Sequence, residues 1–125
     1  MTKYIGNKYW AISAGHIPLH SVGAEPEFTS HDRISILNTC AVEAHLDLMI
    51  FFEDQEPCGP YSVTVKGRRV CKLHFNELID PLPIPLNKPF ACSIRSGTPV
   101  VVQFFRIDTS SDRGSIAGTM ACGLG

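Results

Sequence analysis

Three neighbouring residues, Ser30-His31-Asp32, are of the types that form the catalytic triad of hydrolases. In an extended chain, however, neighbouring side chains point to opposite sides, so these three cannot align as nucleophile, base and orienting carboxylate. The sequence also lacks the G-x-S-x-G, G-x-x-x-x-G-K-[ST] and G-x-G-x-x-G motifs of hydrolases and of nucleotide-binding loops. The residues therefore show no visible catalytic equipment, and we expect no cofactor.

Metal ligands are equally sparse. His16 and His20 have the four-residue spacing of zinc ligands on a helix, but Pro18 between them and Gly15 before them exclude a helix there. No C-x-x-C pair occurs among the five cysteines, which are Cys40, Cys58, Cys71, Cys92 and Cys122. We predict packed or surface histidines, no metal site, and reduced thiols in a cytoplasmic protein.

Two charged clusters have both a structural and a functional interpretation. Glu53, Asp54 and Glu56 crowd one turn, where they either form a solvated cluster or accept hydrogen bonds from a polyhydroxyl ligand or a partner's arginine. The basic residues between positions 66 and 72 either protect an edge strand from aggregation or form a small phosphate or nucleic-acid footprint; they are Lys66, Arg68, Arg69 and Lys72.

Trp10 is the sole tryptophan of the chain. A large aromatic ring most often packs in the core of a protein. The alternative is a stacking platform for a sugar or another planar group, because the indole offers a rigid apolar face and one N–H donor.

Length and composition limit the protein classes that fit. The chain has 125 residues, 44% of them hydrophobic and 18% charged, and a net charge of −1. These values predict a single domain over residues 1–125 that folds without disulfides or a structural metal, and they argue against nucleic-acid binding. The densest apolar run, residues 46–52, is far shorter than the ~20 residues that span a bilayer, and residues 1–20 show no secretory signal. We expect no membrane insertion.

The elements that must position these residues are strands. Alternation of apolar and polar residues, or short β-rich runs, are separated by glycine- and proline-rich turns. The sequence predicts an all-β, single-domain antiparallel β-sandwich, or a small barrel, of about seven or eight short strands. The predicted strands cover residues 9–13, 33–38, 45–52, 61–65, 70–75, 90–95, 100–108 and 114–122, with a turn at 96–99 and an extended proline-rich loop at 76–86.

Some of these strands are apolar on both faces. Met49-Ile50-Phe51-Phe52, Val100-Val101-Val102 and Phe104-Phe105 leave no polar side to face water. A two-layer sandwich exposes one face of each sheet, so something must cover the second apolar face. Either the proline-rich segment at residues 80–89 lies on it or another subunit does, and we favour a closed homo-oligomer.

An ordered set of short motifs resembles one protein family. The motifs run in the same order over residues 10–108 and include Trp10-Ala11-Ile12, Ile17-Pro18, Ser30-His31, Ile36-Leu37-Asn38, Ala44-His45, Glu56-Pro57, Gly59-Pro60-Tyr61, Thr64-Val65, Arg68-Arg69, Phe75-Asn76-Glu77-Leu78, Asp80-Pro81, Pro83-Ile84-Pro85, Phe90-Ala91, Pro99-Val100-Val101-Val102-Gln103, Arg106 and Asp108. With these motifs the chain resembles the sensory rhodopsin transducer family, small prokaryotic proteins named for a partner of a microbial photoreceptor.

The resemblance implies an all-β sandwich that assembles as a homotetramer and has no enzymatic activity. It also implies one of two roles. The first is the binding of a small polar molecule, a sugar or a related metabolite. The second is the relay of a signal by docking on the cytoplasmic side of a membrane photoreceptor. A DNA-contacting role is the least convincing, because the net charge is −1.

Our leading hypothesis from the sequence is a non-enzymatic, tetrameric module that binds a small molecule and regulates another process. Carboxylates, amides and guanidinium groups would meet hydroxyls or phosphates, while an aromatic ring covers an apolar face. The candidate ligand-binding residues are Trp10, Ser30, His31, Glu56, Arg68, Arg69, Asn76, Asp80 and Arg106. The alternative is a signal transducer that docks on a membrane photoreceptor or another partner, with its acidic turn facing the basic cytoplasmic loops of a receptor.

Overall fold

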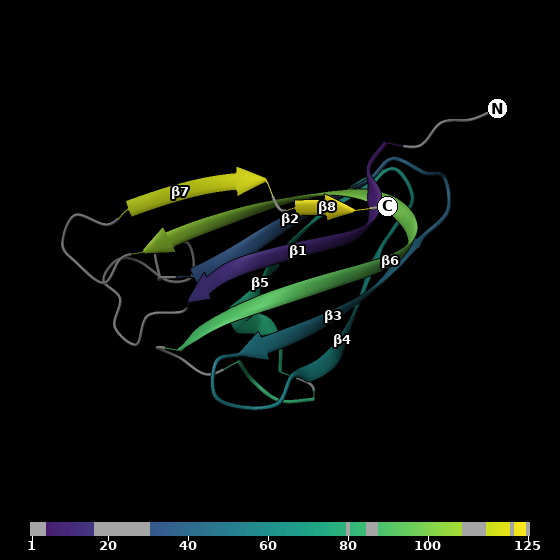
Figure 1. Cartoon of the computed structure of the whole chain (residues 1–125). Coiled ribbons are helices and arrows are strands. Elements are labelled where there is room, and N and C mark those ends of the chain that lie inside the picture. The colour runs from purple at the N-terminus through teal and green to yellow at the C-terminus, as the bar shows by residue number, and fades with distance from the viewer. Residues whose placement is uncertain are drawn as a thin grey trace.

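The computed structural model describes residues 5–16, 31–79, 81–84, 88–108, 115–120 and 122–124. In these ranges every strand pairing is antiparallel and there is no α-helix (Figure 1), which confirms the predicted all-β class. The elements are β1 (Asn7–His16), β2 (His31–Asn38), β3 (Ala44–Phe52), β4 (Cys58–Val65), β5 (Arg69–His74), the short 3-10 helix η1 (Phe75–Glu77), β6 (Pro89–Asp108), β7 (Ser115–Met120) and β8 (Cys122–Leu124).

The 20-residue strand β6 organises the whole fold. Its first part pairs with β1 and β3, and its second part pairs with β2 and β7. Figure 1 shows β6 running across the molecule, bending and returning, so that its two parts lie in two layers. Layer A contains β8, β1, the first part of β6, β3 and β4; layer B contains β5, β2, the second part of β6 and β7. The two layers are therefore continuous through β6.

The prediction of two separate strands at 90–95 and 100–108 is wrong. Residues 96–99 do not form a turn that ends the pairing; they form the bend inside β6. Within the bend, the Ser96 hydroxyl donates to the Thr98 carbonyl at 2.6 Å and accepts from the Thr98 amide at 3.2 Å. A side chain thus satisfies backbone groups where the strand bends. Pairing resumes at once, with Val100 opposite Asn7 and Val101 opposite Leu37.

Burial along the strands follows the alternation of apolar and polar residues in the sequence. In β3, Leu46, Leu48 and Ile50 point into the core, while His45 and Asp47 are exposed. In layer B, Ile34 and Ile36 are fully buried and pack against the side chains of the opposite layer in one hydrophobic cluster. Period-2 alternation identifies these positions because successive strand residues point to opposite sides of a sheet.

The described part of the proline-rich segment closes the core. Leu78 and Ile84 belong to the buried cluster, and the Tyr61 hydroxyl of β4 donates to the Leu82 carbonyl. Apolar side chains meanwhile remain exposed on the outer faces of both layers: Leu37 is 40%, Val70 58% and Phe51 41% accessible. The described residues of the loop thus fill the core and leave these outer positions open.

Candidate functional site

The strand ends gather four of the seven described candidate residues at one end of the molecule. Cross-strand pairs place Phe52 opposite Phe90 and His16 opposite Pro89 in layer A, and His31 opposite Ile107 in layer B. Figure 1 shows the arrowheads of β1, β3 and β6 on the same side. We call this side the acidic end, because it carries the exposed residues Glu53, Asp54 and Glu56 of the β3–β4 turn.

Four of the nine candidates lie at or beside the acidic end. Glu56 is exposed in the turn between β3 and β4. The backbone places His31 at the start of β2, Arg106 opposite Asp32, and Asn76 in η1, directly after β5. Ser30 and Asp80 lie outside the described residues.

The two candidate arginines lie at the opposite end. Arg68 and Arg69 follow β4, whereas Glu56 precedes it, and the eight residues of β4 span roughly 26 Å. Arg68 adopts a left-handed backbone with φ of 57°, and its amide donates to the Cys40 carbonyl at 2.9 Å. The Arg69 Nη1 donates to the Arg68 carbonyl at 3.0 Å. Within one protomer, these two guanidinium groups and Glu56 do not form a single site.

Trp10 lies in the core, only 6% exposed. Its Nε1–H points to the carbonyl oxygens of Asn7 and Val100, each 3.0 Å away. Gly123 of β8 lies against the indole, because a Cβ at that position would come within 3.0 Å of the ring. The core-packing interpretation of Trp10 therefore holds, and its ring cannot form the exposed aromatic wall expected for a ligand site.

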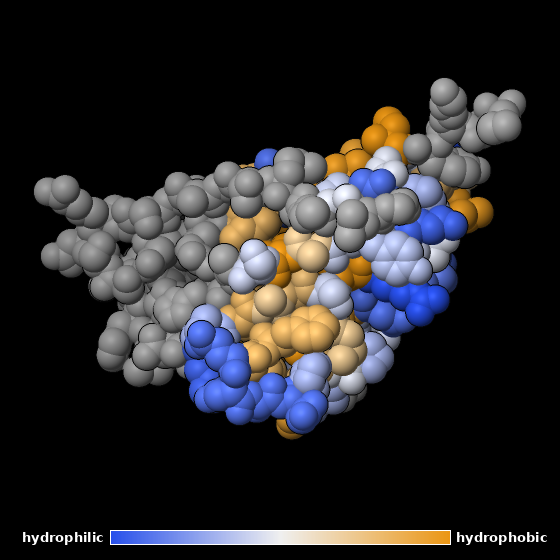
Figure 2. All heavy atoms as spheres, in the orientation of Figure 1, coloured by the Kyte–Doolittle hydropathy of each residue, from blue (hydrophilic) through white to orange (hydrophobic). Residues whose placement is uncertain are grey.

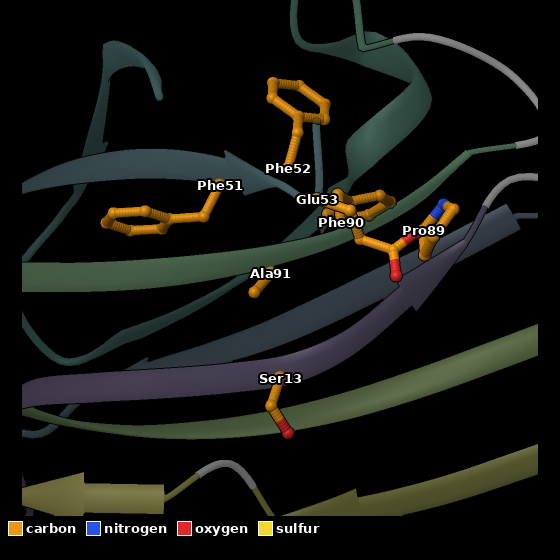
Figure 3. A pocket seen from close by; sticks show the side chains of 7 residues that line it. All are labelled: Ser13, Phe51, Phe52, Glu53, Pro89, Phe90 and Ala91. Carbon is orange, nitrogen blue, oxygen red and sulfur yellow. The ribbon is translucent and has the colours of Figure 1, made fainter. Parts of the chain in front are cut away.

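A different aromatic wall borders a hollow at the acidic end. The hollow has a volume of about 250 Å³ and is lined by Ser13, Phe51, Phe52, Glu53, Pro89, Phe90 and Ala91. In Figure 3, the Phe51 ring lies over the outer face of layer A, Ala91 forms part of the floor, and Glu53 stands beside Pro89 at the rim. Figure 2 shows an apolar area on this face with hydrophilic residues at its border.

The sequence interpretation did not place these residues in a site. It assigned the apolar run at positions 49–52 to contacts between subunits and the neighbouring carboxylates to a turn. The usable signal was the alternation in β3, which puts Phe51 on the outward side two residues before Glu53. The floor residues Ser13 and Ala91 come from β1 and β6 and carried no signal of their own.

Charges in the acidic turn are unequally compensated. Lys88 Nζ lies 3.7 Å from an Asp54 carboxylate oxygen and donates to the Gln55 side-chain carbonyl at 3.2 Å. Glu53 is exposed and has no hydrogen bond or ion pair with another described residue. Its carboxylate is consequently available to an external donor at the edge of the hollow.

A second hollow lies along the start of β4. It measures about 370 Å³ and is lined by Gly59, Pro60, Ser62 and Pro81. Tyr61, between the lining residues, points the other way into the core, and its hydroxyl lies 3.2 Å from Cys58 Sγ. Burial, followed by the hydrogen bond with Cys58, raises the pKa of Tyr61 to about 12, so this hydroxyl is neutral at physiological pH.

The described part of the chain offers little else for chemistry. It contains no group of three or more His, Cys, Asp or Glu side chains that could hold a metal ion. Cys40, Cys58, Cys71 and Cys92 are free thiols, and burial raises the pKa of Cys92 to about 12, which makes it a poor nucleophile. No helix in the described ranges is long and apolar enough to cross a bilayer.

Comparison with known families decides the relationship. The family model of the Anabaena sensory rhodopsin transducer matches residues 5–123. The chain belongs to this transducer family. No curated protein matches the sequence.

Two solved structures support the assignment to the transducer family. The Anabaena sensory rhodopsin transducer is 45% identical to the chain, with a TM-score of 0.76, and the match covers 82% of this chain and 99% of that one. Thermotoga maritima 1070 is 27% identical, with a TM-score of 0.80, and the match covers 95% and 96% of the two chains. The family resemblance inferred from the sequence is thereby confirmed.

Proposed function

We propose that this protein is a non-catalytic, cytoplasmic regulatory module that relays the state of a membrane receptor by docking on its cytoplasmic side. Family membership over residues 5–123 carries this proposal, because the name of the 45% identical relative describes a transducer for a sensory rhodopsin. The acidic end supplies the contact surface. Cytoplasmic loops of membrane proteins carry an excess of lysine and arginine, which are complementary to exposed carboxylates.

Calorimetric titration of the protein into nanodiscs that hold the Anabaena sensory rhodopsin tests the docking. We expect saturable binding that weakens with rising salt, because exposed charges are screened beyond about 10 Å at 0.1 M. Neutralising the acidic end with Glu53→Gln, Asp54→Asn and Glu56→Gln should reduce the affinity. The matched control is Lys66→Gln with Arg68→Gln at the opposite end of β4. Equal binding of both variants would contradict docking through the acidic end.

A second candidate function is the binding of a small polar ligand, a sugar or a related metabolite. The 370 Å³ hollow favours it, because Pro60 and Pro81 stiffen the backbone and Ser62 offers a hydroxyl, and stiff loops lose little entropy on binding. Glu56 precedes this hollow in the chain. His31, Asn76 and Arg106, at the same end, remain in the proposed recognition surface.

A thermal-shift screen of sugars, sugar phosphates and nucleotides tests this candidate. A ligand at 100 times its Kd stabilises a fold by about 2.7 kcal/mol, which raises Tm by on the order of 10 °C for a domain of this size. Ser62→Ala should weaken a true hit, whereas Thr64→Ala, on the same strand but outside the hollow, should not. A screen without hits contradicts the second candidate and leaves the docking proposal in place.

We further propose that the protein works as a homotetramer. Leu37 and Val70 are directly paired across β2 and β5, and both are exposed on the outer face of layer B. Two adjacent exposed aliphatic side chains favour burial against another copy. Light scattering of the purified protein should give four times the 13.7 kDa protomer mass. Leu37→Lys should shift the mass toward smaller species, and a monomeric parent would contradict the proposal.

A further inference from the structure

We propose that the hollow at the acidic end is a pocket for one basic side chain, an arginine or a lysine, of the partner polypeptide. This inference rests on the proposed docking function and names the chemistry of the contact. Three features carry it: an exposed aromatic ring, a carboxylate without a partner among the described residues, and a floor of small side chains.

The aromatic wall is Phe51. It is 41% exposed on the outer face of β3, although its neighbours Ile50 and Phe52 turn toward the core. Directly across the strand pair stands Ala91, whose methyl group is too small to cover the ring. A guanidinium or ammonium group that enters the hollow can therefore approach the face of Phe51, where the ring quadrupole attracts cations.

The carboxylate is Glu53, at the rim of the same hollow. The neighbouring cation, Lys88, lies 3.7 Å from an Asp54 carboxylate oxygen and donates to Gln55, and it forms no ion pair with Glu53. An arginine that enters the hollow can pair its planar guanidinium with the Glu53 carboxylate at the rim, while its apolar stem lies along the aromatic lining. The local excess of negative charge selects a cation over an anion.

The lining also disfavours a polyhydroxyl occupant. A sugar needs donors and acceptors arranged around its ring. Among the described lining residues, the polar side chains are one hydroxyl, from Ser13, and one carboxylate, from Glu53; the other five are apolar. An acceptor beside aromatic surface matches an organic cation better than a neutral hydroxylated ring.

The same molecule shows the interaction with its own residues on the other layer. The guanidinium carbon of Arg33 lies 5.1 Å from the centre of the Phe105 ring, and the two residues are directly paired across β2 and β6. Phe51 and Ala91 are paired in the same way across β3 and β6. The position that Arg33 fills over Phe105 is therefore left free over Phe51.

An NMR titration tests the pocket with defined probes. N-acetylarginine methylamide represents an arginine within a polypeptide, and N-acetylcitrulline methylamide is its neutral counterpart. We expect the arginine probe to shift the amide resonances of Phe51, Glu53 and Ala91, and the citrulline probe to leave them unchanged. Equal shifts with both probes, or tighter binding of glucose, would overturn the proposal. Tighter binding of free arginine than of the blocked form would assign the pocket to a metabolite and would also overturn it.

Matched variants locate the site. Glu53→Gln should weaken binding of the arginine probe about fivefold, the effect of removing one favourable ion pair. Phe51→Ala should weaken it by a similar factor. The control is Glu56→Gln, which removes a carboxylate from the same turn but outside the hollow and should change the affinity less than twofold. If Glu53→Gln and Glu56→Gln behave alike, the acidic end attracts cations without a pocket, and the proposal is wrong.

Receptor binding separates this inference from the proposed function. If Glu53→Gln and Phe51→Ala retain parental affinity for the nanodisc-held rhodopsin, docking stands and the pocket is refuted. If the parent protein does not bind the receptor but binds the arginine probe in a Glu53-dependent way, the pocket stands and that receptor is the wrong partner. Circular dichroism of each variant should match the parent, because Phe51 and Glu53 are both exposed.

Discussion

Two phenylalanines on the outer faces of the two layers have opposite surroundings. Phe105 in layer B is covered by Arg33 from the neighbouring strand, with the guanidinium 5.1 Å from the ring centre. Phe51 in layer A faces Ala91 across the strand pair, and Glu53 lines the same hollow. One aromatic ring thus has an internal cation, and the other has a carboxylate and an open hollow.

The difference distinguishes a surface whose contact is made within the protomer from the surface that we propose for recognition. On layer B the cation–π contact is made within the protomer, next to His74, whose Nδ1 lies 3.3 Å from a Glu77 carboxylate oxygen. On layer A the corresponding position has the aromatic ring of Phe51 but no cation across the strand pair. A surface that binds a partner must leave part of its interactions unmade in the free protein, since only those can contribute to association.

The largest effects concern the core beneath the two faces, where the layers should behave alike. Leu48 in layer A and Ile36 in layer B are fully buried. Leu48→Ala and Ile36→Ala should each lower the free energy of unfolding by about 2–5 kcal/mol, measured by urea denaturation. A loss below about 1 kcal/mol in one layer only would show that its packing is loose, and the comparison of the outer faces would then reflect packing and not chemistry.

The next largest effect is the loss of stability at alkaline pH, to which Tyr61 of layer A contributes. Tyr61 of layer A has a pKa raised from 10.0 to about 12, chiefly by burial. A raised folded-state pKa contributes stability that is present below pH 10 and is lost as the pH rises toward 12. Tyr61→Phe should cost about 1 kcal/mol at pH 7, through the lost hydrogen bond to Leu82, and should remove this part of the alkaline fall. The part due to Cys92, whose pKa is also about 12, should remain.

The measurement is the free energy of unfolding by urea at several pH values between 7 and 11, for the parent and for Tyr61→Phe. Parallel curves for the two proteins would contradict the assigned role of the tyrosine hydroxyl.

The cation on layer B should have a smaller, local effect. Arg33→Ala uncovers Phe105 and removes the packing of the arginine stem, so we expect a loss of about 1 kcal/mol in the free energy of unfolding. The matched variant is Arg95→Ala, an exposed arginine on the outer face of layer A, with an expected change within about 0.5 kcal/mol. Equal losses would mean that the ring contact contributes nothing specific.

The smallest effect is expected from a substitution that reproduces on layer A the arginine–phenylalanine pair of layer B. Ala91→Arg places a guanidinium directly across from Phe51, as Arg33 stands across from Phe105. We expect a gain of about 0.5 kcal/mol in the free energy of unfolding and loss of binding of the arginine probe, because the pocket is then filled from within. Ala91→Gln, long but neutral, should not give the stability gain. An Ala91→Arg protein that still binds the probe at parental affinity would contradict the pocket.

Much of the fold is readable from the sequence, and the exception is instructive. Alternation identifies the buried faces of β2 and β3, since burial depends on a local period. It does not reveal that β6 continues through Ser96-Gly97-Thr98-Pro99. Those residue types are typical of a turn, but the Ser96 hydroxyl binds the Thr98 backbone and the ladders on both sides persist.

The candidate site was harder to predict, because its members meet only through strand register. Trp10 was a candidate for the aromatic wall of a ligand site, but its N–H donates to the Val100 carbonyl, 90 positions away in the sequence. Arg68 and Glu56 are close in sequence yet lie at opposite ends of β4. Ser13, Phe51 and Ala91 come from three strands, and nothing in their local sequence links them. Polar residue types alone therefore predict chemistry without predicting which groups share a site.

The bent course of β6 has a mechanical consequence. This strand holds hydrogen-bond ladders to four neighbours, two on each side of its bend. Separating one layer from the other would therefore also disrupt β6, which is a central strand of both layers. Force applied to the rim by a docked protein would travel along one unbroken backbone from the first sheet to the second.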